Sequence, residues 1–360
     1  MRMAVISLGS VSSQMTIKAM KKYCHDVDDI NLKDVEVTIT SKGNGVLYKG
    51  ESLEGYDCIL AKGSFRYAPL LRAITLVSNK NAYMPLVPSA FTIGHDKILT
   101  HLALQKHGIP MPETYLSATS DSAKKILEKI NYPIIMKFPH GTQGKGVMFA
   151  ESYAAASSML DALSALNQPF LIQEYVETDG QDVRAIVVGD KVVASYMRES
   201  ADGEKRANIH AGGHGKAYEI DAHTKKIAVK AAQAVGADIC GVDILESIKG
   251  PVVIEINLSP GLQGVTAATK IDVADKIAKF LYEKTKKFKD STKKKATKDI
   301  MQEISSNGLG KEIITALDFR GERILLPEFV TKETKFKESD ELVLTIKKGK
   351  ISIEKFSINK

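Results

Sequence analysis

The sequence predicts an α/β (α+β) fold made of several compact units. Its 360 residues exceed what one small core accommodates, and 44% apolar with 26% charged residues is typical of a globular chain rather than a disordered or fibrous one. Strand-like apolar runs also alternate with stretches of helical spacing. The first run, Met3 to Leu8, is followed by a turn at Gly9 and by helical spacing through Ile17 and Met20.

Further strand and helix patterns follow along the chain. Tyr56 to Ala61 is a second strand candidate that leads into a helix-like stretch, so the first part of the chain is expected to form a small open α/β sheet. Helical spacing covers Phe91 to His107 and Thr224 to Val235. The β-branched runs on both sides of Gly189 and Asp190 predict a hairpin with a two-residue turn.

The composition excludes several classes of protein. The apolar runs are strand-sized and interrupted, so we expect neither a membrane partner nor secretion. Cys24, Cys58 and Cys240 lie far apart and form no CxxC pair, which argues against a disulfide framework and against a zinc ribbon. A reducing cytoplasm is therefore the expected location.

The net charge of +7 is unevenly distributed. Leu281 to Ile300 carries eight lysines against three acidic residues, so +5 of the excess lies in twenty residues. A nucleic-acid footprint usually interleaves aromatic residues or arginine, and this run has no arginine. We interpret 284–300 as a solvated lysine-rich linker and do not expect a nucleic-acid partner.

A carboxylate and an amide share one strand near residue 255. Glu255 and Asn257 are two residues apart, so they point to one face, which Val253 would share. Asp243 has a similar place in the preceding strand. Mg²⁺ takes oxygen ligands and often joins protein carboxylates to nucleotide phosphates. The three polar residues are metal-ligand candidates, the alternative being strand-end groups bonded to neighbouring backbone.

Residues that could bind phosphate precede Glu255 and Asn257 in the chain. The segment GTQGKG lies between two expected strands and matches neither the Walker nor the GxGxxG pattern. A glycine-rich backbone, here with Gly144 and Gly146, can still surround phosphates with its N–H groups. The alternative is a plain tight turn. Lys137 ends the apolar strand PIIMK, where burial is costly unless an anion meets the ammonium. Lys97 lies on the expected helix 91–107, where a surface lysine is the alternative.

A polar strand end follows. A strand that ends in amide and carboxylate groups can read an adenine edge and ribose hydroxyls, although an ordinary edge strand is the alternative. The residues are Gln173, Glu174, Tyr175 and Val176, followed by Asp182 and Arg184.

These motifs together resemble the RimK-type branch of the ATP-grasp ligases over about residues 88–282. The matching motifs are GTQGKGV, QEYV, DVRAIVVGD, NIHAGG, GVDIL and EINLSPGLQG, in that order. The resemblance implies an ATP-grasp fold preceded by a small Rossmann-like α/β domain and followed by a small β-rich domain. The expected divisions are 1–90 for the N-terminal domain, 91–180 and 181–283 for the two ATP-grasp subdomains, 284–300 for the linker and 301–360 for the C-terminal domain.

The resemblance also implies a carboxylate–amine ligase. ATP, with Mg²⁺ or Mn²⁺, would phosphorylate a carboxylate to an acyl phosphate that an amine, most simply that of L-glutamate, then attacks. The acceptor would be a protein C-terminus or a coenzyme. The implied ATP contacts are Lys97, Lys137, Gly144, Gly146, Gln173 to Val176 and Asp182, and the implied metal ligands are Asp243, Glu255 and Asn257.

Other residues are assigned to the substrates by the same resemblance. Arg198 would stabilise the acyl phosphate and the tetrahedral oxyanion, because a fixed cationic fork suits an oxyanion, and Asn208 would orient the substrate or the intermediate. The substrate contacts would be Arg184, Arg206, Ser259 and Gly261. The sequence departs from the RimK pattern at Ala211, where that pattern has a basic residue that would help to recognise acidic groups of the substrate. A ribosomal protein C-terminus, the usual acceptor of RimK, is therefore less strongly indicated for this chain.

The C-terminal residues resemble an AbrB-type swapped-hairpin module. Ile324 to Pro327 and Ser339 to Leu342 follow its pattern, and 341–356 has the spacing of a hairpin. The charge after Met301 is only +1, a poor electrostatic footprint for DNA. We expect this module to make the protein a homo-oligomer, a dimer or tetramer, or to dock a substrate. The alternative function is a nucleotide-sensing scaffold or a DNA-associated regulator.

Overall fold

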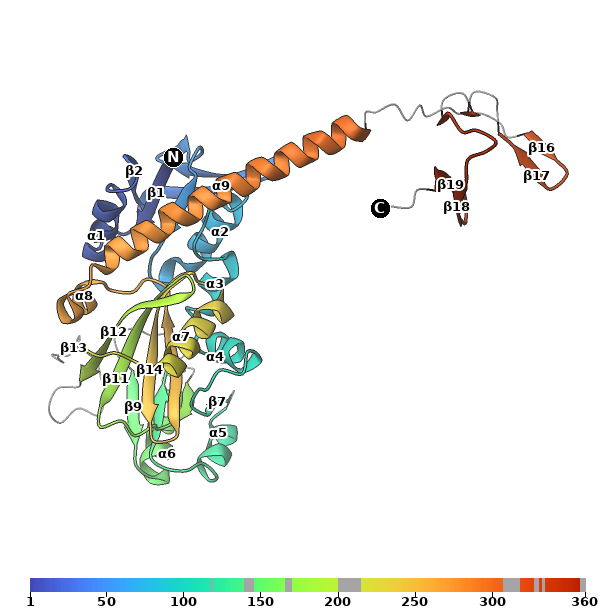
Figure 1. The fold of residues 1–360 in the computed structure, drawn as a ribbon. Coiled ribbons are helices and arrows are strands. Elements are labelled where there is room, and N and C mark those ends of the chain that lie inside the picture. Colours follow the sequence, from blue (N-terminus) through green and yellow to red (C-terminus); the bar gives the residue numbers. More distant parts are fainter. Residues whose placement is uncertain are drawn as a thin grey trace. The chain divides into compact units, whose positions relative to one another are not determined.

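The computed structural model describes the backbone of residues 1–117, 119–138, 146–165, 170–199, 215–306, 318–326, 330–331 and 334–356, and side chains in these ranges except 293–306 and 318 (Figure 1). The chain divides into two compact units, Met1–Lys294 and Lys295–Lys360. Within the described ranges, no helix combines the length and the apolar character needed to cross a bilayer.

The N-terminal part of the first unit is a parallel sheet in the strand order β2-β1-β6, which agrees with the small open α/β sheet that the sequence predicts. Because β1 and β6 pair in parallel, their carboxyl ends lie at the same edge of the sheet. A small antiparallel sheet, β3-β4-β5, was not predicted. The elements are β1 (Arg2–Ser7), α1 (Val11–Met20), β2 (Asp26–Asn31), β3 (Val35–Thr40), β4 (Gly43–Tyr48), β5 (Glu51–Ser52), β6 (Cys58–Ala61) and α2 (Ala68–Ser78).

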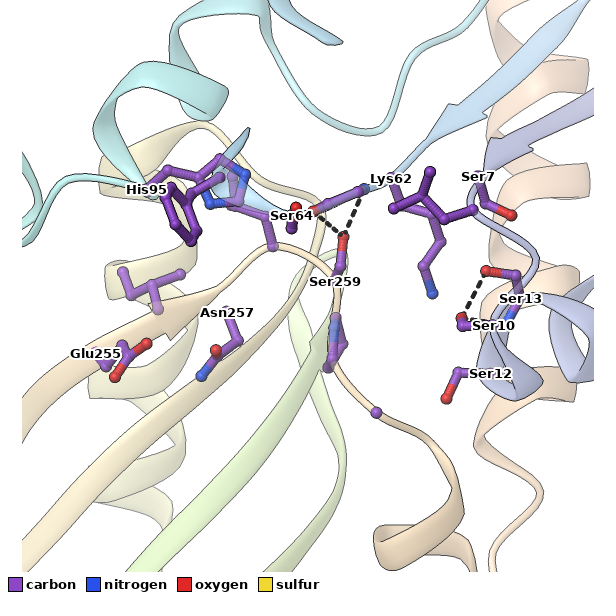
Figure 2. Close-up of a pocket in the computed structure, with 18 of the residues that line it drawn as sticks. Ser7, Ser10, Ser12, Ser13, Lys62, Ser64, His95, Glu255, Asn257 and Ser259 are labelled. Carbon is purple, nitrogen blue, oxygen red and sulfur yellow. Dashed lines mark hydrogen bonds between the residues drawn. The ribbon is translucent and has the colours of Figure 1, made fainter. Parts of the chain in front are cut away.

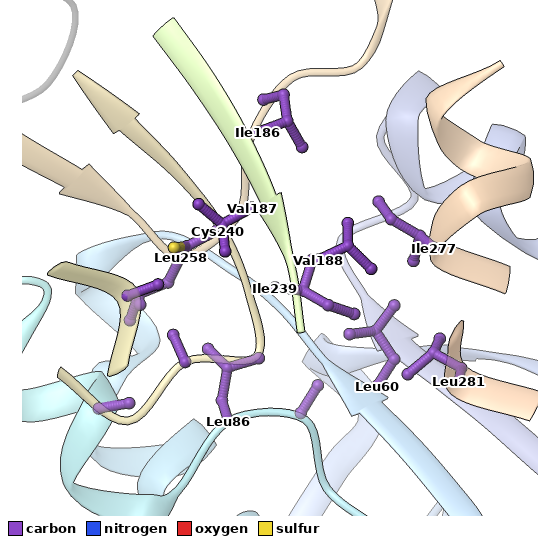
Figure 3. Close-up of a cluster of buried hydrophobic side chains, with 14 of the residues drawn as sticks. Leu60, Leu86, Ile186, Val187, Val188, Ile239, Cys240, Leu258, Ile277 and Leu281 are labelled. Carbon is purple, nitrogen blue, oxygen red and sulfur yellow. The ribbon is translucent and has the colours of Figure 1, made fainter. Parts of the chain in front are cut away.

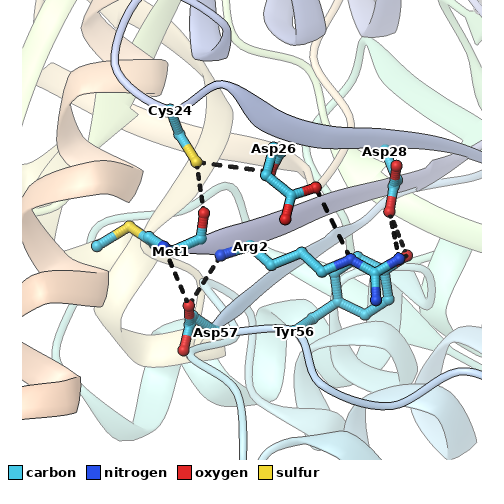
Figure 4. Close-up of polar contacts among 7 residues, drawn as sticks. All are labelled: Met1, Arg2, Cys24, Asp26, Asp28, Tyr56 and Asp57. Atoms are coloured by element: carbon cyan, nitrogen blue, oxygen red, sulfur yellow. Dashed lines mark hydrogen bonds and ion pairs between the residues drawn. The ribbon is translucent and has the colours of Figure 1, made fainter.

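Polar contacts fix the amino end of β1 (Figure 4). The Arg2 guanidinium donates to Asp28 at 2.9 Å and lies over the Tyr56 ring, 4.3 Å from its centroid. The backbone N–H of Arg2 donates to Asp57 at 2.8 Å, and Asp57 also pairs with Lys289 at 2.7 Å. These contacts lie at the end of β1 away from Ser7, so the carboxyl end of the strand is left for other interactions.

A four-stranded sheet, β7-β10-β8-β9, has its own apolar core under α5 and α6. Leu127, Met136 and Leu160 are fully buried in this core. Its strands are short and their pairing is antiparallel throughout. The elements are β7 (Thr114–Leu116), α5 (Ser120–Leu127), β8 (Ile134–Lys137), β9 (Val147–Ala150), α6 (Tyr153–Ala165) and β10 (Leu171–Glu174).

A five-stranded antiparallel sheet, β13-β12-β11-β14-β15, carries six of the predicted polar residues, Asp182, Arg184, Arg198, Asp243, Glu255 and Asn257. The predicted hairpin is confirmed, since Val188 pairs with Lys191 across the turn at Gly189 and Asp190. Helix α7 packs across β11, β12, β14 and β15. The elements are β11 (Gln181–Val188), β12 (Lys191–Glu199), β13 (Gly215–Ala217), α7 (Ala222–Val235), β14 (Ile239–Ser247), β15 (Gly250–Asn257) and α8 (Gln263–Thr269).

One continuous apolar core joins the N-terminal sheet to the five-stranded sheet (Figure 3). Leu60 of β6 and Leu86 lie in the same cluster as Val188 of β11, Ile239 of β14 and Ile277. Backbone pairing adds to this packing, because the Val87 N–H donates to the Gly236 carbonyl at 3.0 Å. The two sheets are therefore held together by buried side chains, and not only by the chain that connects them.

The helix expected over 91–107 is two helices, α3 (Pro88–Ile93) and α4 (Lys97–Lys106). Gly94 ends the first helix, and the Asp96 side chain caps the second by accepting from the N–H groups of Ile98 and Leu99. A side chain at 94 would meet Leu258 at about 2.9 Å, so only glycine allows this close approach. The break places Lys97 at the amino end of α4.

The lysine-rich segment expected as a linker over 284–300 lies within a single long helix, α9 (Val273–Ser306). Lysine is a good helix former, which favours continuation of the helix through this solvated run. In the second unit, the hairpin expected over 341–356 is confirmed by β18 (Leu342–Lys347) and β19 (Lys350–Lys355), and β16 (Asp318–Arg320) pairs with β17 (Arg323–Leu325). The likeness to an AbrB-type module and the domain divisions remain predictions, and Pro327 lies outside the described residues.

Gly236 is expected to be intolerant of a side chain. It ends α7 with φ of +75°, and an added Cβ would lie 2.3 Å from Val87 Cγ2. Gly236→Ala should lower the free energy of unfolding by about 2–5 kcal/mol, from backbone strain together with overpacking. Gly55→Ala is the matched control, because Gly55 has φ of +80° in open space and should lose only about 1–2 kcal/mol. Equal losses by chemical denaturation would contradict the packing described here.

Candidate active site

Four charged side chains meet on one face of the five-stranded sheet. Asp182 and Arg184 of β11 lie opposite Arg198 of β12 and Asp243 of β14, respectively. Arg184 donates to both oxygens of Asp243, at 2.6 Å each. Arg198 donates to both oxygens of Asp182 and also contacts Asp243 Oδ2 at 2.9 Å. Two guanidiniums and two carboxylates thus balance their charges within the sheet.

The electrostatics of this network differ between its two carboxylates. Burial alone would raise the pKa of Asp243, but the guanidiniums of Arg184 and Arg198 outweigh it and hold that pKa far below its ordinary value. Burial raises the pKa of Asp182, against the opposing effect of Arg198. Asp243 is therefore ionised across the neutral range, and breaking its pairs would leave buried charges uncompensated.

The predicted roles of Asp182, Arg184 and Asp243 require the network to open. Asp243 accepts from Arg184, from Arg198 and, at 3.2 Å, from Asn257 Nδ2. A cation bound at Asp243 would have to displace some of these donors. The ribose contact predicted for Asp182 and the substrate contact predicted for Arg184 likewise compete with the ion pairs seen here, and both remain predictions.

Glu255 and Asn257 line a cavity of about 530 Å³ (Figure 2). The β14–β15 pairing shifts at this point: Asp243 pairs with Glu255 and Ile244 with Val253, so Ile254 is an extra residue. The alternation expected from Val253 to Glu255 is therefore broken, and Val253 is buried in the core while Ile254 lines the cavity.

This pair of oxygen donors suits a hard cation. Because the Asn257 amide nitrogen donates to Asp243, its oxygen is left for another partner. The described residues include no cluster of three or more His, Cys, Asp or Glu placed as a metal site. A cation here would take Glu255, the Asn257 oxygen, phosphate oxygens and water, which is the mixed ligand set that Mg²⁺ commonly has.

The two lysines predicted to bind phosphate, Lys97 and Lys137, are close enough to interact electrostatically. Burial, with Lys97 as a second cause, lowers the pKa of Lys137 to about 8, against the opposing effect of Glu255. Lys97 lines the cavity beside Glu255 and Asn257. The structure thus brings together Lys97, Lys137 and Glu255, which are up to 158 positions apart in the chain. Such a set of charges suits a polyphosphate bridged to a metal ion.

A buried polar chain, which the sequence analysis did not find, joins Lys137 to the strand that carries Glu255. Lys137 donates to Gln173 Oε1 at 2.6 Å, and Gln173 Nε2 donates to Thr114 Oγ1 at 2.7 Å. Thr114 Oγ1 lies 2.9 Å from His101 Nδ1, and His101 Nε2 lies 3.4 Å from the Ile254 carbonyl.

The protonation of His101 follows from its surroundings. Burial, with Lys137 as a second cause, lowers the pKa of His101 to about 4, so the ring is neutral at pH 7. The Thr114 hydroxyl can donate its one proton either to the Pro112 carbonyl, at 3.0 Å, or to His101 Nδ1. With Nε2–H donating to the Ile254 carbonyl, Nδ1 of the neutral ring is an acceptor for that proton. The sequence contains little from which this row of hydrogen-bonded side chains could be predicted. The helical periodicity of α4 is the only indication that His101 points inward, and no local motif includes Thr114.

The remaining predicted residues have different positions. Glu174 ends β10, and the Tyr175 ring makes an edge contact with Phe149 at 5.0 Å. Gly146 has φ of +78° and lies so close to the Phe138 ring that a Cβ would overlap it. Ser259 and Gly261 line the cavity, whereas Val176 follows the end of β10. Gly144, Asn208, Arg206 and Ala211 lie outside the described residues.

Thr114→Val should destabilise the protein, because the change leaves buried polar groups of Gln173 and His101 without a partner. We expect a loss of about 1–3 kcal/mol in the free energy of unfolding, measured by chemical denaturation. Thr114→Ser, which keeps the hydroxyl, is the matched control and should lose less. Equal losses of unfolding free energy in the valine and serine variants would show that the hydrogen bonds of Thr114 do not stabilise the protein.

Comparison with solved structures gives the fold. PsnB, an ATP-grasp ligase solved with a minimal precursor, Mg and ADP, has a TM-score of 0.62 at 19% identity, covering 79% of this chain and 98% of PsnB. A RimK domain ATP-grasp protein from Sphaerobacter thermophilus has a TM-score of 0.60 at 20% identity, covering 78% of this chain and 99% of that one.

Comparison with curated sequences and family profiles gives the family. A probable alpha-L-glutamate ligase from Vibrio cholerae is 36% identical over 276 residues, 75% of this chain and 91% of the relative. One from Methanococcoides burtonii is 36% identical over 291 residues, 79% and 95% of the two chains. The profile of the RimK-like ATP-grasp domain matches residues 94–281. The chain belongs to the RimK-like ATP-grasp family and is an ATP-dependent carboxylate–amine ligase.

Proposed function

We propose that the protein joins L-glutamate, through its amine, to a carboxylate of a peptide, a protein C-terminus or a coenzyme, with MgATP as the energy source. The observation that carries the proposal is the gathering of Lys97, Glu255 and Asn257 around one cavity, with Lys137 close enough to Lys97 and Glu255 to interact electrostatically. The names of the curated relatives support glutamate as the amino acid. Mn²⁺ is the alternative ion.

The chemistry explains why these charges are needed. A carboxylate is a poor electrophile, so its oxygen first takes the γ-phosphoryl group of ATP, which releases ADP and leaves an acyl phosphate. The amine then attacks the acyl carbon, the new C–N bond forms, and the C–O bond to phosphate breaks as the amine loses a proton. Water must be kept out while the acyl phosphate exists.

Each group of residues has a role in this scheme. Lys97 and Lys137 would neutralise the phosphates, and Glu255 with Asn257 would hold a metal ion, which supplies charge neutralisation at the γ-phosphoryl group. The polar chain behind Lys137 would fix its position. Asp182 and Asp243 engage Nε and Nη2 of Arg198 in the described contacts, so we assign its Nη1 to the oxyanion.

The acceptor, the location and the assembly of the protein are also proposals. Structural neighbours bind precursor peptides, as PsnB and the macrocyclase MdnC do, which supports a peptide-like acceptor. The cytoplasm suits an enzyme that uses ATP. Val343, Leu344 and Ile346 of the C-terminal hairpin are exposed, which supports association with further copies of the chain. A monomeric mass by light scattering would contradict that association.

The ligase reaction is tested by ADP release from MgATP with amino acids crossed against candidate carboxylates, followed by mass spectrometry. A positive pair should give a product heavier by whole glutamyl units. Release of ADP with other amino acids but never with L-glutamate would contradict the proposed amino acid. Tight ATP binding with no release from any pair would instead favour a nucleotide-sensing scaffold.

Glu255→Gln tests the metal assignment. Loss of the carboxylate should reduce ADP release by at least about 100-fold, because the γ-phosphoryl group loses its metal-held neutralisation. Glu219→Gln is the matched control, since Glu219 is exposed and pairs only with Lys225 among the described residues, and it should keep full activity. Unchanged turnover of Glu255→Gln would show that Glu255 holds no essential metal.

A further inference from the structure

The cavity has a second polar end, which the ATP-grasp residues do not form. Ser7 and Lys62 lie at the carboxyl ends of β1 and β6, and α1 begins directly beside them with its cap, Ser10. Figure 2 shows this group on the side of the cavity away from Glu255. The two ends therefore come from different sheets that share one core.

Lys62 is a buried cation that faces this cavity. Its exposure is 8%, and among the described residues its ammonium has no hydrogen-bond or ion-pair partner. Burial lowers the pKa of Lys62 to about 8. In Figure 2 its Nζ points into the space between Ser259 and the serines of α1. A buried ammonium without an anion is costly, so the geometry favours a negatively charged ligand at this position.

The amino end of α1 adds to the same preference. The helix has ten residues with no acidic residue in its first turn, so no carboxylate of that turn offsets its dipole, and Ser10, Ser12 and Ser13 at this end line the cavity. The Ser13 N–H is capped by Ser10 Oγ at 3.3 Å. The Ser12 hydroxyl accepts from the Leu262 N–H at 2.9 Å, which fixes the helix end against the loop after β15. Lys62 and this helix end together form a preorganised anion site.

A second contact couples the anion site to the metal-binding strand. The Gly63 N–H donates to Ser259 Oγ at 3.2 Å, and the Ser259 hydroxyl lies 3.3 Å from the Gly63 carbonyl. Gly63 follows Lys62 directly, and Ser259 lies two residues after Asn257. The distance between the ammonium and the proposed metal ligands is thereby held by direct contacts across the cavity.

We propose that Lys62 and the amino end of α1 bind a substrate carboxylate that is not the one being activated. The inference rests on the proposed function, because the activated carboxylate must reach the phosphates at the Glu255 end, which leaves the Lys62 end for a second carboxylate. A dicarboxylic amino acid brings such a group. An acidic acceptor is the other source, and the two sources are distinguished by experiment.

Calorimetry on the full chain, loaded with Mg²⁺ and AMPPNP, tests the inference without turnover. L-glutamate and glutarate are titrated into wild type, Lys62→Met and Lys62→Arg. Lys62→Met should weaken carboxylate binding by at least about tenfold, whereas Lys62→Arg should keep most of it. Lys33→Met, at an exposed lysine of the same domain, is the matched control. AMPPNP should bind all four proteins equally, which shows that they are folded.

Steady-state kinetics with the acceptor found in the ADP-release panel assign the carboxylate. In Lys62→Met, a KM raised for L-glutamate alone places the amino acid at this site, and a KM raised for the acceptor alone places the acceptor there. If neither calorimetry nor KM shows weaker binding of any carboxylate in Lys62→Met, the inference is wrong. Failure of the proposed function has a different signature, because wild type would then release no ADP with any pair.

Discussion

The packing of the N-terminal parallel sheet against the five-stranded sheet is the contact on which the site depends. Leu60, Val188 and Ile239 are buried in one cluster, so the two sheets cannot separate without exposing apolar surface to water. This contact places the carboxyl end of β6, with Lys62, opposite the end of β15, with Glu255. A single cavity then receives charged groups from both sheets.

The second constraint is the balance of buried charge. On the five-stranded sheet, Asp182 and Asp243 are matched by Arg184 and Arg198, so this network satisfies itself and holds the strands in register. The cavity is different, because Glu255, Lys97 and Lys62 all line it. The paired charges stabilise the sheet, whereas we propose that the charges around the cavity bind phosphates, a cation and carboxylates that arrive with the substrates.

The motifs that carry chemistry could be predicted because they are local. The hairpin at Gly189 and the Glu255–Asn257 pair follow from short-range patterns, and the family follows from the order of the motifs. The close approach of Leu258 to Gly94, at the break before Lys97, could not be predicted, because Leu258 comes from a distant loop that follows β15. The role of Lys62 was missed for the same reason: its burial depends on the docking of two sheets, and no sequence motif surrounds it.

The central claim is that phosphates, metal and substrates meet in this one cavity. It is tested most directly by a crystal structure of the full chain with Mn²⁺ and AMPPNP, with the ion located by its anomalous scattering. The account predicts an anomalous peak bonded to Glu255 and to the Asn257 amide oxygen, with the γ-phosphate between that peak and Lys97. A nucleotide bound with its phosphates outside the cavity, or a peak that touches neither Glu255 nor Asn257, would contradict it.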